Sequence, residues 1–144
     1  MPDDVEREVR IAARPETVFD FLVDPALQVR WMGIDATLEP KPGGIYRVVV
    51  NRSSAVRGEF VEVVPHSRVV FTWGFEEPGA AVPPAASTVE ITLTPDGDGT
   101  VLRLVHRDLP EPTRAQHDKG WEHFLDRLRH VAAGDDPGPD PWAA

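Results

Sequence analysis

His106 and His117 are the two side chains of this sequence whose types and positions most favour chemistry. An imidazole exchanges protons near neutral pH, so either residue can act as an acid, as a base or as a hydrogen-bonding group for a ligand. His106 follows Leu102 and Leu104 on one face of an alternating segment, and His117 lies four residues before Trp121. The structural alternative, a core histidine with a satisfied hydrogen bond, remains open for both residues.

An enzymatic use of these histidines needs partners, and the sequence offers only Glu59 and Arg47 as candidates. The reaction would be the cyclisation, dehydration or hydrolysis of a polyketide-like substrate. The chain contains no nucleophile elbow, no recognisable triad and no set of metal ligands. We therefore assign no catalytic residue, and the sequence favours a binding protein over an enzyme.

Other chemistry is weakly supported. His123 and His130 flank Asp126 on a predicted helix face that points to water, which is typical of solvated histidines and predicts no metal. The stretch Gly43-Gly44 lacks the lysine and the strand-to-helix context of a phosphate loop. The turn at residues 95–99 lacks the later glutamate and the helix of a calcium loop. No cofactor is expected.

Composition limits the classes of protein that remain. The 144 residues fit one domain, and a hydrophobic fraction of 41% is enough for a core. A net charge of −9 argues against a nucleic-acid partner. No apolar run of about 18 residues exists to insert into a membrane. The chain has no cysteine, and its acidic start predicts no secretory signal, so a cytoplasmic location is expected.

The elements that must position these residues follow from periodicity and turn signals. Alternation over residues 5–11 predicts a strand with Arg7 as its weak point. Pro15 and Asp24-Pro25 each begin a short helix, the second ending near Arg30. Further strands are predicted at 45–50, 56–64, 68–75, 88–94 and 101–107, with a proline-rich mobile loop over 76–86.

A long C-terminal helix is predicted from Thr113, as its cap, to about Ala133, with Gly134 ending it. A helical wheel places one apolar stripe on it, formed by His117, Trp121, Phe124, Leu125, Leu128 and Ala132. We expect one domain over residues 1–134 and a disordered, acidic, proline-rich tail over 135–144.

The order of elements predicts an α+β fold. Consecutive strands joined by short turns form an antiparallel sheet of about six to seven strands, and only the last helix is long enough to cover its buried face. The curved sheet would grip this helix around an apolar cavity. The residues expected to line the cavity are Trp31, Tyr46, Val48, Phe71, Trp73, Phe75, His106, His117 and Trp121.

Several stretches within residues 5–132 carry a family resemblance. They are Arg10–Phe19, Asp24-Pro25 followed by Trp31, Gly43-Gly44, Gly58–Pro65, Val69–Trp73, Gly99-Thr100 with Leu102, Leu104 and His106, and Gly120-Trp121 with Leu125 and Leu128. In this order and spacing they resemble the START-related, birch-pollen-allergen-like helix-grip superfamily (SRPBCC). Within it, the sequence is most similar to the group related to the C-terminal domain of the Hsp90 ATPase activator.

The resemblance implies several functions. Similar domains bind lipids, polyketides or hormones, cyclise or dehydrate polyketides, sequester toxic natural products, or regulate a chaperone in the stress response. We expect non-catalytic binding of a small hydrophobic or aromatic molecule. The alternatives are a cyclase, dehydratase or hydrolase of the polyketide type that uses a cavity histidine, and a protein-interaction module. A homodimer is left open.

Overall fold

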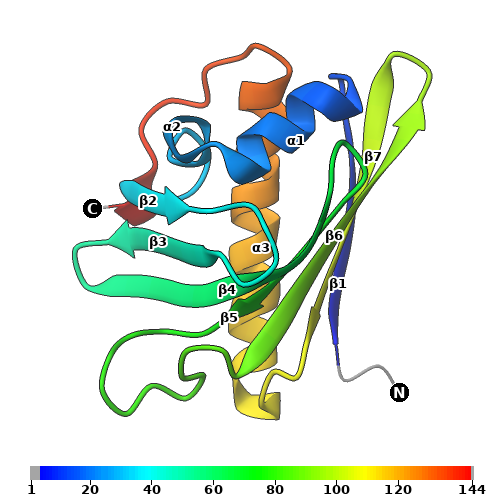
Figure 1. Ribbon diagram of the computed structural model, residues 1–144. Helices are drawn as coiled ribbons and strands as arrows, with labels where there is room; N and C mark the ends of the chain where they lie inside the picture. Colours follow the sequence, from blue (N-terminus) through cyan, green and yellow to red (C-terminus); the bar gives the residue numbers. More distant parts are fainter. Residues whose placement is uncertain (1–3, 144) are drawn as a thin grey trace.

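Seven strands form one curved antiparallel sheet that wraps around a long C-terminal helix (Figure 1). The computed structural model describes residues 4–143. Its elements are β1 (Val5–Ile11), α1 (Pro15–Val23), α2 (Pro25–Gln28), β2 (Asp35–Leu38), β3 (Ile45–Asn51), β4 (Ser54–Val64), β5 (Arg68–Trp73), β6 (Ser87–Asp96), β7 (Gly99–Arg107), α3 (Glu111–Ala132) and a final 3-10 turn, η1 (Pro141–Ala143). The predicted α+β helix-grip fold is confirmed.

The strand order is β1-β7-β6-β5-β4-β3-β2. From β2 to β7 each strand pairs antiparallel with its sequence neighbour, and β1 joins the far edge beside β7. The hairpin that joins β6 to β7 has a two-residue loop, in which Asp96 pairs with Gly99 and Gly97 has a φ of +61°. A positive φ at that position suits glycine, which has no side chain to strain.

The curvature of the sheet has identifiable local causes. The pairing register shifts between Val49 and Asn51 in β3 and between Phe60 and Glu62 in β4. Such bulges bend a strand and increase its twist. At Gly58 the backbones approach so closely that a Cβ would lie 1.9 Å from the carbonyl oxygen of Thr72. The bent strands therefore form a trough around α3 instead of a flat layer.

The two short helices lie over one end of the trough (Figure 1). Proline occupies the first turn of each, and the Asp24 side chain accepts a hydrogen bond from the backbone N–H of Ala26 at 2.9 Å, which caps α2. The apolar face of α1 is buried at Val18, Phe19, Phe21 and Leu22. The second helix ends at Gln28, two residues earlier than predicted.

The apolar stripe of α3 faces the sheet. Every member that the helical wheel placed inside, from His117 to Ala132, is buried. Arg7, the weak point of β1, makes a paired contact to Asp118 on α3 at 2.8 and 2.9 Å. This contact ties the edge strand to the helix, which explains a charged residue on the inward face of β1.

The start of α3 differs from the prediction. The helix begins at Glu111, so Thr113 lies inside the first turn and is not the cap. The Thr113 hydroxyl donates a hydrogen bond to the carbonyl oxygen of Pro110 at 2.7 Å. Pro112 is compatible with this earlier start because the first helical N–H groups need no intrahelical acceptor. The end is as predicted, with Gly134 at a φ of +94°.

Two strands also differ from the prediction. The sequence pattern did not reveal β2, a four-residue edge strand that pairs with β3. Strand β5 ends at Trp73, and Phe75 forms only an isolated bridge with Val56. The loop after it is irregular as predicted, but Val82 within it is buried and accepts the backbone N–H of Phe75.

The tail, for which the sequence predicts disorder, follows a defined path as far as residue 143. It returns along α3 so that Trp142 stacks on His123, with ring centroids 4.0 Å apart. His123, predicted to face water, is therefore partly covered. Asp140 accepts a hydrogen bond from Nε2 of His123 at 2.8 Å. Ring contacts of Trp142 with His123 and Phe124 and the hydrogen bond from Asn51 to the Trp142 carbonyl oxygen hold this segment against the rest of the domain.

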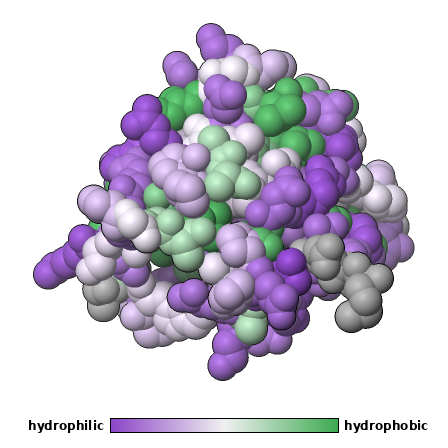
Figure 2. All heavy atoms as spheres, turned by 90° about the horizontal axis from the view of Figure 1, so that it is seen from below, coloured by the Kyte–Doolittle hydropathy of each residue, from purple (hydrophilic) through white to green (hydrophobic). Residues whose placement is uncertain are grey.

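The face of the molecule seen from below is mainly hydrophilic (Figure 2). Figure 2, which views the molecule from below, shows hydrophobic side chains in small separate groups among hydrophilic ones. Scattered exposed apolar residues of this kind are normal for folded proteins. Among the helices of residues 4–143, none combines the length and apolar character needed to cross a bilayer.

Candidate functional site

A cavity of about 160 Å³ lies where α3, the β3–β4 hairpin, the end of β5 and the tail meet. It opens to the surface beside Trp142. Its lining is aromatic and apolar with a few amide, hydroxyl and imidazole groups, namely Met32, Val50, Asn51, Ser54, Trp73, Phe75, Gln116, His117, Gly120, Trp121, Phe124 and Trp142. None of these side chains carries a fixed charge, so the cavity favours neutral molecules.

The alternation of side chains along β5 and the three- and four-residue spacing along α3 bring the lining residues together. Trp73 is the last inward residue of β5, and Phe75 continues the alternation beyond the strand. Residues 117, 120, 121 and 124 repeat at the three- and four-residue spacing of one helix face. The rings pack closely, with centroids 5.0 Å apart for Trp73 and Trp121 and 5.8 Å apart for Phe75 and His117.

Gly120 keeps the helical wall of the cavity open. It lies in the middle of a 22-residue helix, where glycine costs about 1 kcal/mol relative to alanine. A Cβ built on it would meet no atom within 4 Å, so no close packing requires glycine here. The residue's visible effect is the space that it leaves between His117 and Trp121.

His106 lies behind this wall in a fully hydrogen-bonded network. Its side chain is 0% exposed. The indole Nε1 of Trp121 donates to Nδ1 of His106 at 3.0 Å. On the other side, Nε2 of His106 lies 2.8 Å from the hydroxyl oxygen of Ser87, which itself donates to the carbonyl oxygen of Trp73 at 2.8 Å.

These directions fix the protonation of the network. Because Nδ1 accepts from Trp121, the single proton of a neutral His106 is on Nε2 and is donated to Ser87. Burial, with a smaller contribution from nearby His117, lowers the pKa of His106 to about 3. His106 therefore cannot take the proton of Ser87, and the geometry counts against a serine nucleophile.

His117 differs from His106 in having a free ring nitrogen. Its Nδ1 lies 2.9 Å from the carbonyl oxygen of Thr113, an acceptor, so Nδ1 carries the proton. Its Nε2 is buried and has no hydrogen-bond partner among the described residues. Burial lowers the pKa of His117, and the hydrogen bond to Thr113 opposes this only in part. The imidazole is neutral at pH 7, and its Nε2 offers a lone pair.

Trp73 has an unpaired hydrogen-bond donor, where His117 has an unpaired acceptor. Its indole Nε1 is also buried without a partner within residues 4–143. An unsatisfied buried donor or acceptor costs about 1–3 kcal/mol. Two residues that line the cavity thus carry one unused donor and one unused acceptor, and their ring centroids lie 6.4 Å apart.

Four of the nine predicted site residues line the cavity, namely Trp73, Phe75, His117 and Trp121. Tyr46, Val48 and Phe71 lie deeper in the core, where Tyr46 stacks on Phe71 with centroids 3.9 Å apart. His106 lies behind the cavity wall, where it is hydrogen-bonded to Trp121 and Ser87. Side chains of this middle part of the sheet fill the trough, which is why the cavity is small.

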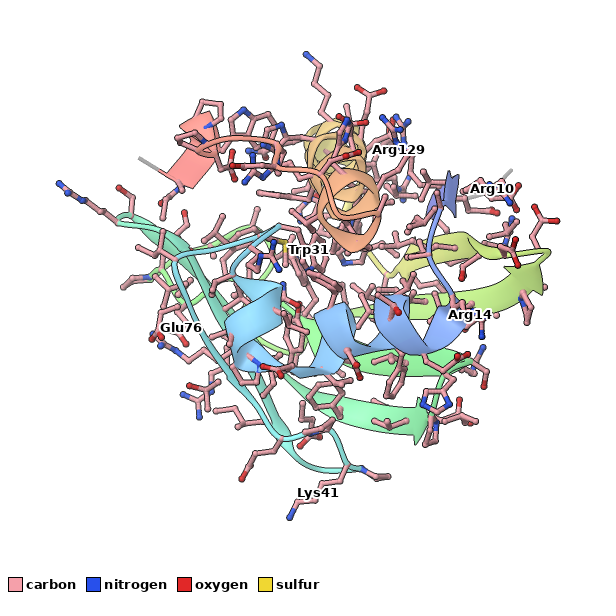
Figure 3. The ribbon with its side chains drawn as sticks, turned by 90° about the horizontal axis from the view of Figure 1, so that it is seen from above. Arg10, Arg14, Trp31, Lys41, Glu76 and Arg129 are labelled. Atoms are coloured by element: carbon pink, nitrogen blue, oxygen red, sulfur yellow. The ribbon has the colours of Figure 1, made fainter. Side chains whose placement is uncertain are left out.

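Trp31 is placed away from the cavity. It is 2% exposed, and its Nε1 donates to the carbonyl oxygen of Phe21 at 2.9 Å. Figure 3 shows it inside the molecule, whereas Arg129 and Glu76 lie at the periphery. Trp31 joins the short helices to the core, and the next residue, Met32, lines the cavity instead.

The proposed catalytic partners do not approach the histidines. Arg47 alternates with the buried Tyr46 and Val48, so it lies on the other face of β3, where it pairs with Glu76 at 2.7 Å. Glu59 is exposed. The hypothesis that Arg47 or Glu59 assists His106 or His117 is therefore wrong. Within residues 4–143, no three His, Asp or Glu side chains are grouped closely enough to hold a metal ion.

Most residues of the cavity lining were not predicted from the sequence. The unpredicted lining residues are Met32, Val50, Asn51, Ser54, Gln116, Gly120, Phe124 and Trp142. Gly120, a helix-interior glycine between two predicted inward residues, was the one available signal. No sequence pattern places Trp142, because its position depends on the path of the tail.

A larger hollow of about 760 Å³ lies between α3, β1 and the tail, but its character is different. Charged side chains of both signs line it, and some of them pair with each other, as Arg7 does with Glu122. None of its described lining residues has a buried polar atom without a hydrogen-bond partner. We therefore take the aromatic cavity as the candidate site.

Comparisons with known proteins agree with this architecture. The chain is 30% identical over 111 residues to the human activator of 90 kDa heat shock protein ATPase homolog 1, covering 76% of this chain and 31% of that protein. The chain thus spans about a third of the length of this curated relative.

Solved structures extend the likeness. An AHSA1-like protein from Rhizobium etli is 46% identical, with a TM-score of 0.76 over 100% of this chain and 91% of that one. DynU16, a putative protein in the dynemicin biosynthetic locus, is 27% identical, with a TM-score of 0.79 over 94% of this chain and 49% of that one. The family model described as activator of Hsp90 ATPase homolog 1-like protein matches residues 12–133. The chain belongs to this family.

Proposed function

We propose that this protein binds a small, neutral, largely apolar molecule in the cavity beside Gly120, without transforming it. The observation that carries the proposal is the aromatic-walled cavity between sheet, helix and tail. Apolar walls with a few polar groups are typical of small-molecule sites. The origin of DynU16 in a biosynthetic locus is in keeping with a small organic ligand.

The volume limits the ligand. A cavity of about 160 Å³ is smaller than the roughly 300–1,000 Å³ of sites for drug-sized molecules. It is close to the roughly 150 Å³ of an engineered apolar cavity that binds benzene. With Trp142 in its present position, the cavity therefore suits one aromatic ring. Burial of such a ring contributes about 25 cal/mol per Å² of apolar surface, less the costs of ordering.

Gly120 supplies the direct test. We expect Gly120→Leu to reduce the affinity for benzene and toluene at least about tenfold, because its side chain would occupy the open space above residue 120. Isothermal titration calorimetry measures the loss. Gly120→Ala is the matched control, and we expect it to raise the free energy of unfolding by about 0.5–1 kcal/mol through helix propensity.

Two results would count against the proposed function. One is equal affinity of the wild type and Gly120→Leu, which would place binding elsewhere. The other is the absence of any calorimetric signal or thermal stabilisation across a panel of one-ring compounds, since saturation at 100 times Kd stabilises a protein by about 2.7 kcal/mol. Circular dichroism of the leucine variant checks that the fold is intact.

Trp142 sets the upper limit on ligand size. The tail holds it over the cavity mouth, with its carbonyl oxygen accepting a hydrogen bond from Nδ2 of Asn51 at 3.3 Å. We expect Trp142→Ala to admit two-ring compounds, so that naphthalene binds more tightly than to the wild type. The lost stacking on His123 should cost about 0.5–1.5 kcal/mol of stability. Unchanged discrimination between benzene and naphthalene would contradict a limiting role for Trp142.

The family supports one second candidate, a chaperone cofactor. The human relative is an activator of the 90 kDa heat shock protein ATPase, although this chain spans about a third of it. Stimulation of Hsp90 ATP turnover by this protein, measured with and without a saturating cavity ligand, tests this function independently of binding.

A further inference from the structure

Trp73 and His117, which line the same cavity, carry opposite hydrogen-bonding needs. Trp73 Nε1 can only donate, and His117 Nε2 can only accept as long as the ring is neutral. Neither atom has a partner among the described residues, although both side chains are more than nine-tenths buried. The other two buried indoles or imidazoles nearby, Trp121 and His106, are fully paired. The need for a partner is therefore specific to Trp73 and His117.

The direction of the His117 acceptor is held by the backbone. The carbonyl oxygen of Thr113, 2.9 Å from Nδ1, keeps the ring proton on that side. Thr113 lies in the first turn of α3, where its own hydroxyl is bonded to Pro110. The tautomer is thus set by the start of the helix and does not depend on a ligand.

A hydroxyl, like a water molecule, can satisfy a donor and an acceptor through one oxygen. It donates one hydrogen bond and accepts others through the same oxygen, whereas an ether or ketone can only accept and an ammonium can only donate. A carboxylate would enter a cavity whose lining has no fixed positive charge and would remain unpaired. A phenolic hydroxyl, with a pKa of about 10, is neutral at pH 7 and keeps its proton for His117.

We propose that the cavity selects small hydroxylated aromatic molecules, with the hydroxyl accepting from Trp73 Nε1 and donating to His117 Nε2 while the ring lies among the aromatic walls. The inference rests on the proposed function and goes beyond it by naming the ligand class. The volume of about 160 Å³ supplies the one-ring limit, and the two unpartnered atoms supply the hydroxyl.

Phenol and toluene make the sharpest test because they differ only in a hydroxyl and a methyl of similar size. An apolar cavity without polar partners would prefer toluene, since phenol would lose its hydrogen bonds to water. We expect the wild type to bind phenol at least about tenfold more tightly than toluene by calorimetry.

Two variants locate the effect. His117→Phe keeps a ring of similar size but removes the acceptor, so the ratio of the two affinities should fall below one. His117→Gln restores an acceptor near the position of Nε2, and part of the preference should return. Thermal unfolding of each variant confirms that it is folded before the affinities are compared.

Nuclear magnetic resonance adds a readout at the donor. We expect phenol, but not toluene, to move the indole N–H signal of Trp73 downfield as it gains a hydrogen bond. The indole signals of Trp31 and Trp121 are internal controls, because their N–H groups are already bonded to Phe21 and His106. The variant Trp73→Phe assigns the signal.

The possible outcomes separate the two claims. Toluene binding as tightly as phenol, or a phenol preference that persists in His117→Phe, would overturn the hydroxyl inference and leave the proposed cavity binding intact. If neither compound binds the wild type at millimolar concentration, both claims fail. A phenol preference that disappears in His117→Phe and returns in His117→Gln supports both.

Discussion

Replacing His106 with leucine should lower the free energy of unfolding by about 3 kcal/mol. The substitution leaves the Trp121 Nε1 donor buried without an acceptor and removes the hydrogen bond to Ser87. A buried donor that loses its partner costs about 1–3 kcal/mol, and each lost hydrogen bond contributes about 1 kcal/mol more. Chemical denaturation measures the change, and thermal unfolding should show a melting temperature lower by about 10 °C.

The network also predicts that substitutions at His106 and Ser87 have non-additive effects on the free energy of unfolding. Ser87→Ala alone should cost about 1–2 kcal/mol, and the double variant should be more stable than the sum of the single effects implies, because both substitutions remove the same hydrogen bond. His130→Leu is the matched control, since His130 lies on the outer side of α3 and bonds only to its own helix. A loss below about 1 kcal/mol for His106→Leu would show that the network contributes little to stability.

The second large effect is a loss of stability in mild acid. The folded-state pKa of His106 is lowered to about 3, whereas an unfolded histidine titrates near 6.5. Between these values the unfolded chain binds a proton that the folded protein does not, so stability falls as the pH falls below about 6.5. From pH 7 to pH 4.5 the expected loss from His106 is on the order of 2 kcal/mol, and His117, whose pKa is also lowered, adds to it.

Acidic groups contribute mainly at lower pH. Hydrogen bonds from arginine lower the pKa values of Glu76 and Glu90 below the ordinary value of 4.5. Their stabilising contribution is present above that value and is lost as the pH falls through the folded-state pKa. The interval from pH 6.5 to 4.5 therefore reports mainly on histidines.

One substitution separates the contribution of His106 to this pH dependence from the contributions of the other titratable groups. His106→Asn keeps an acceptor for Trp121 but cannot titrate, so its unfolding free energy should depend on pH less than half as steeply between pH 6.5 and 4.5. The wild type, measured at the same pH values, is the reference. Urea denaturation at several pH values measures both, and an unaltered slope in His106→Asn would contradict the neutral, buried state of this imidazole.

Much of the fold could be predicted from the sequence because the signals are local. Alternation identified β1, β6 and β7, and the wheel of α3 separated His117 and Trp121 from His130. Strand β2 was missed because four edge residues carry too little periodicity to register. The start of α3 was misplaced because a threonine is a frequent cap and prolines obscured the earlier turn.

The sequence by itself determined that two histidines and several aromatic residues lie inside a sheet that grips a helix, since inward faces follow from periods of 2 and 3.6 residues. Only the tertiary structure decided that His106 is fully bonded while His117 and Trp73 are not. Hydrogen-bond partners and cavity volume depend on distances between elements far apart in the chain. For the same reason the sequence could not show that Tyr46 and Phe71 fill the middle of the trough, or that Trp142 returns to cover the space beside Gly120.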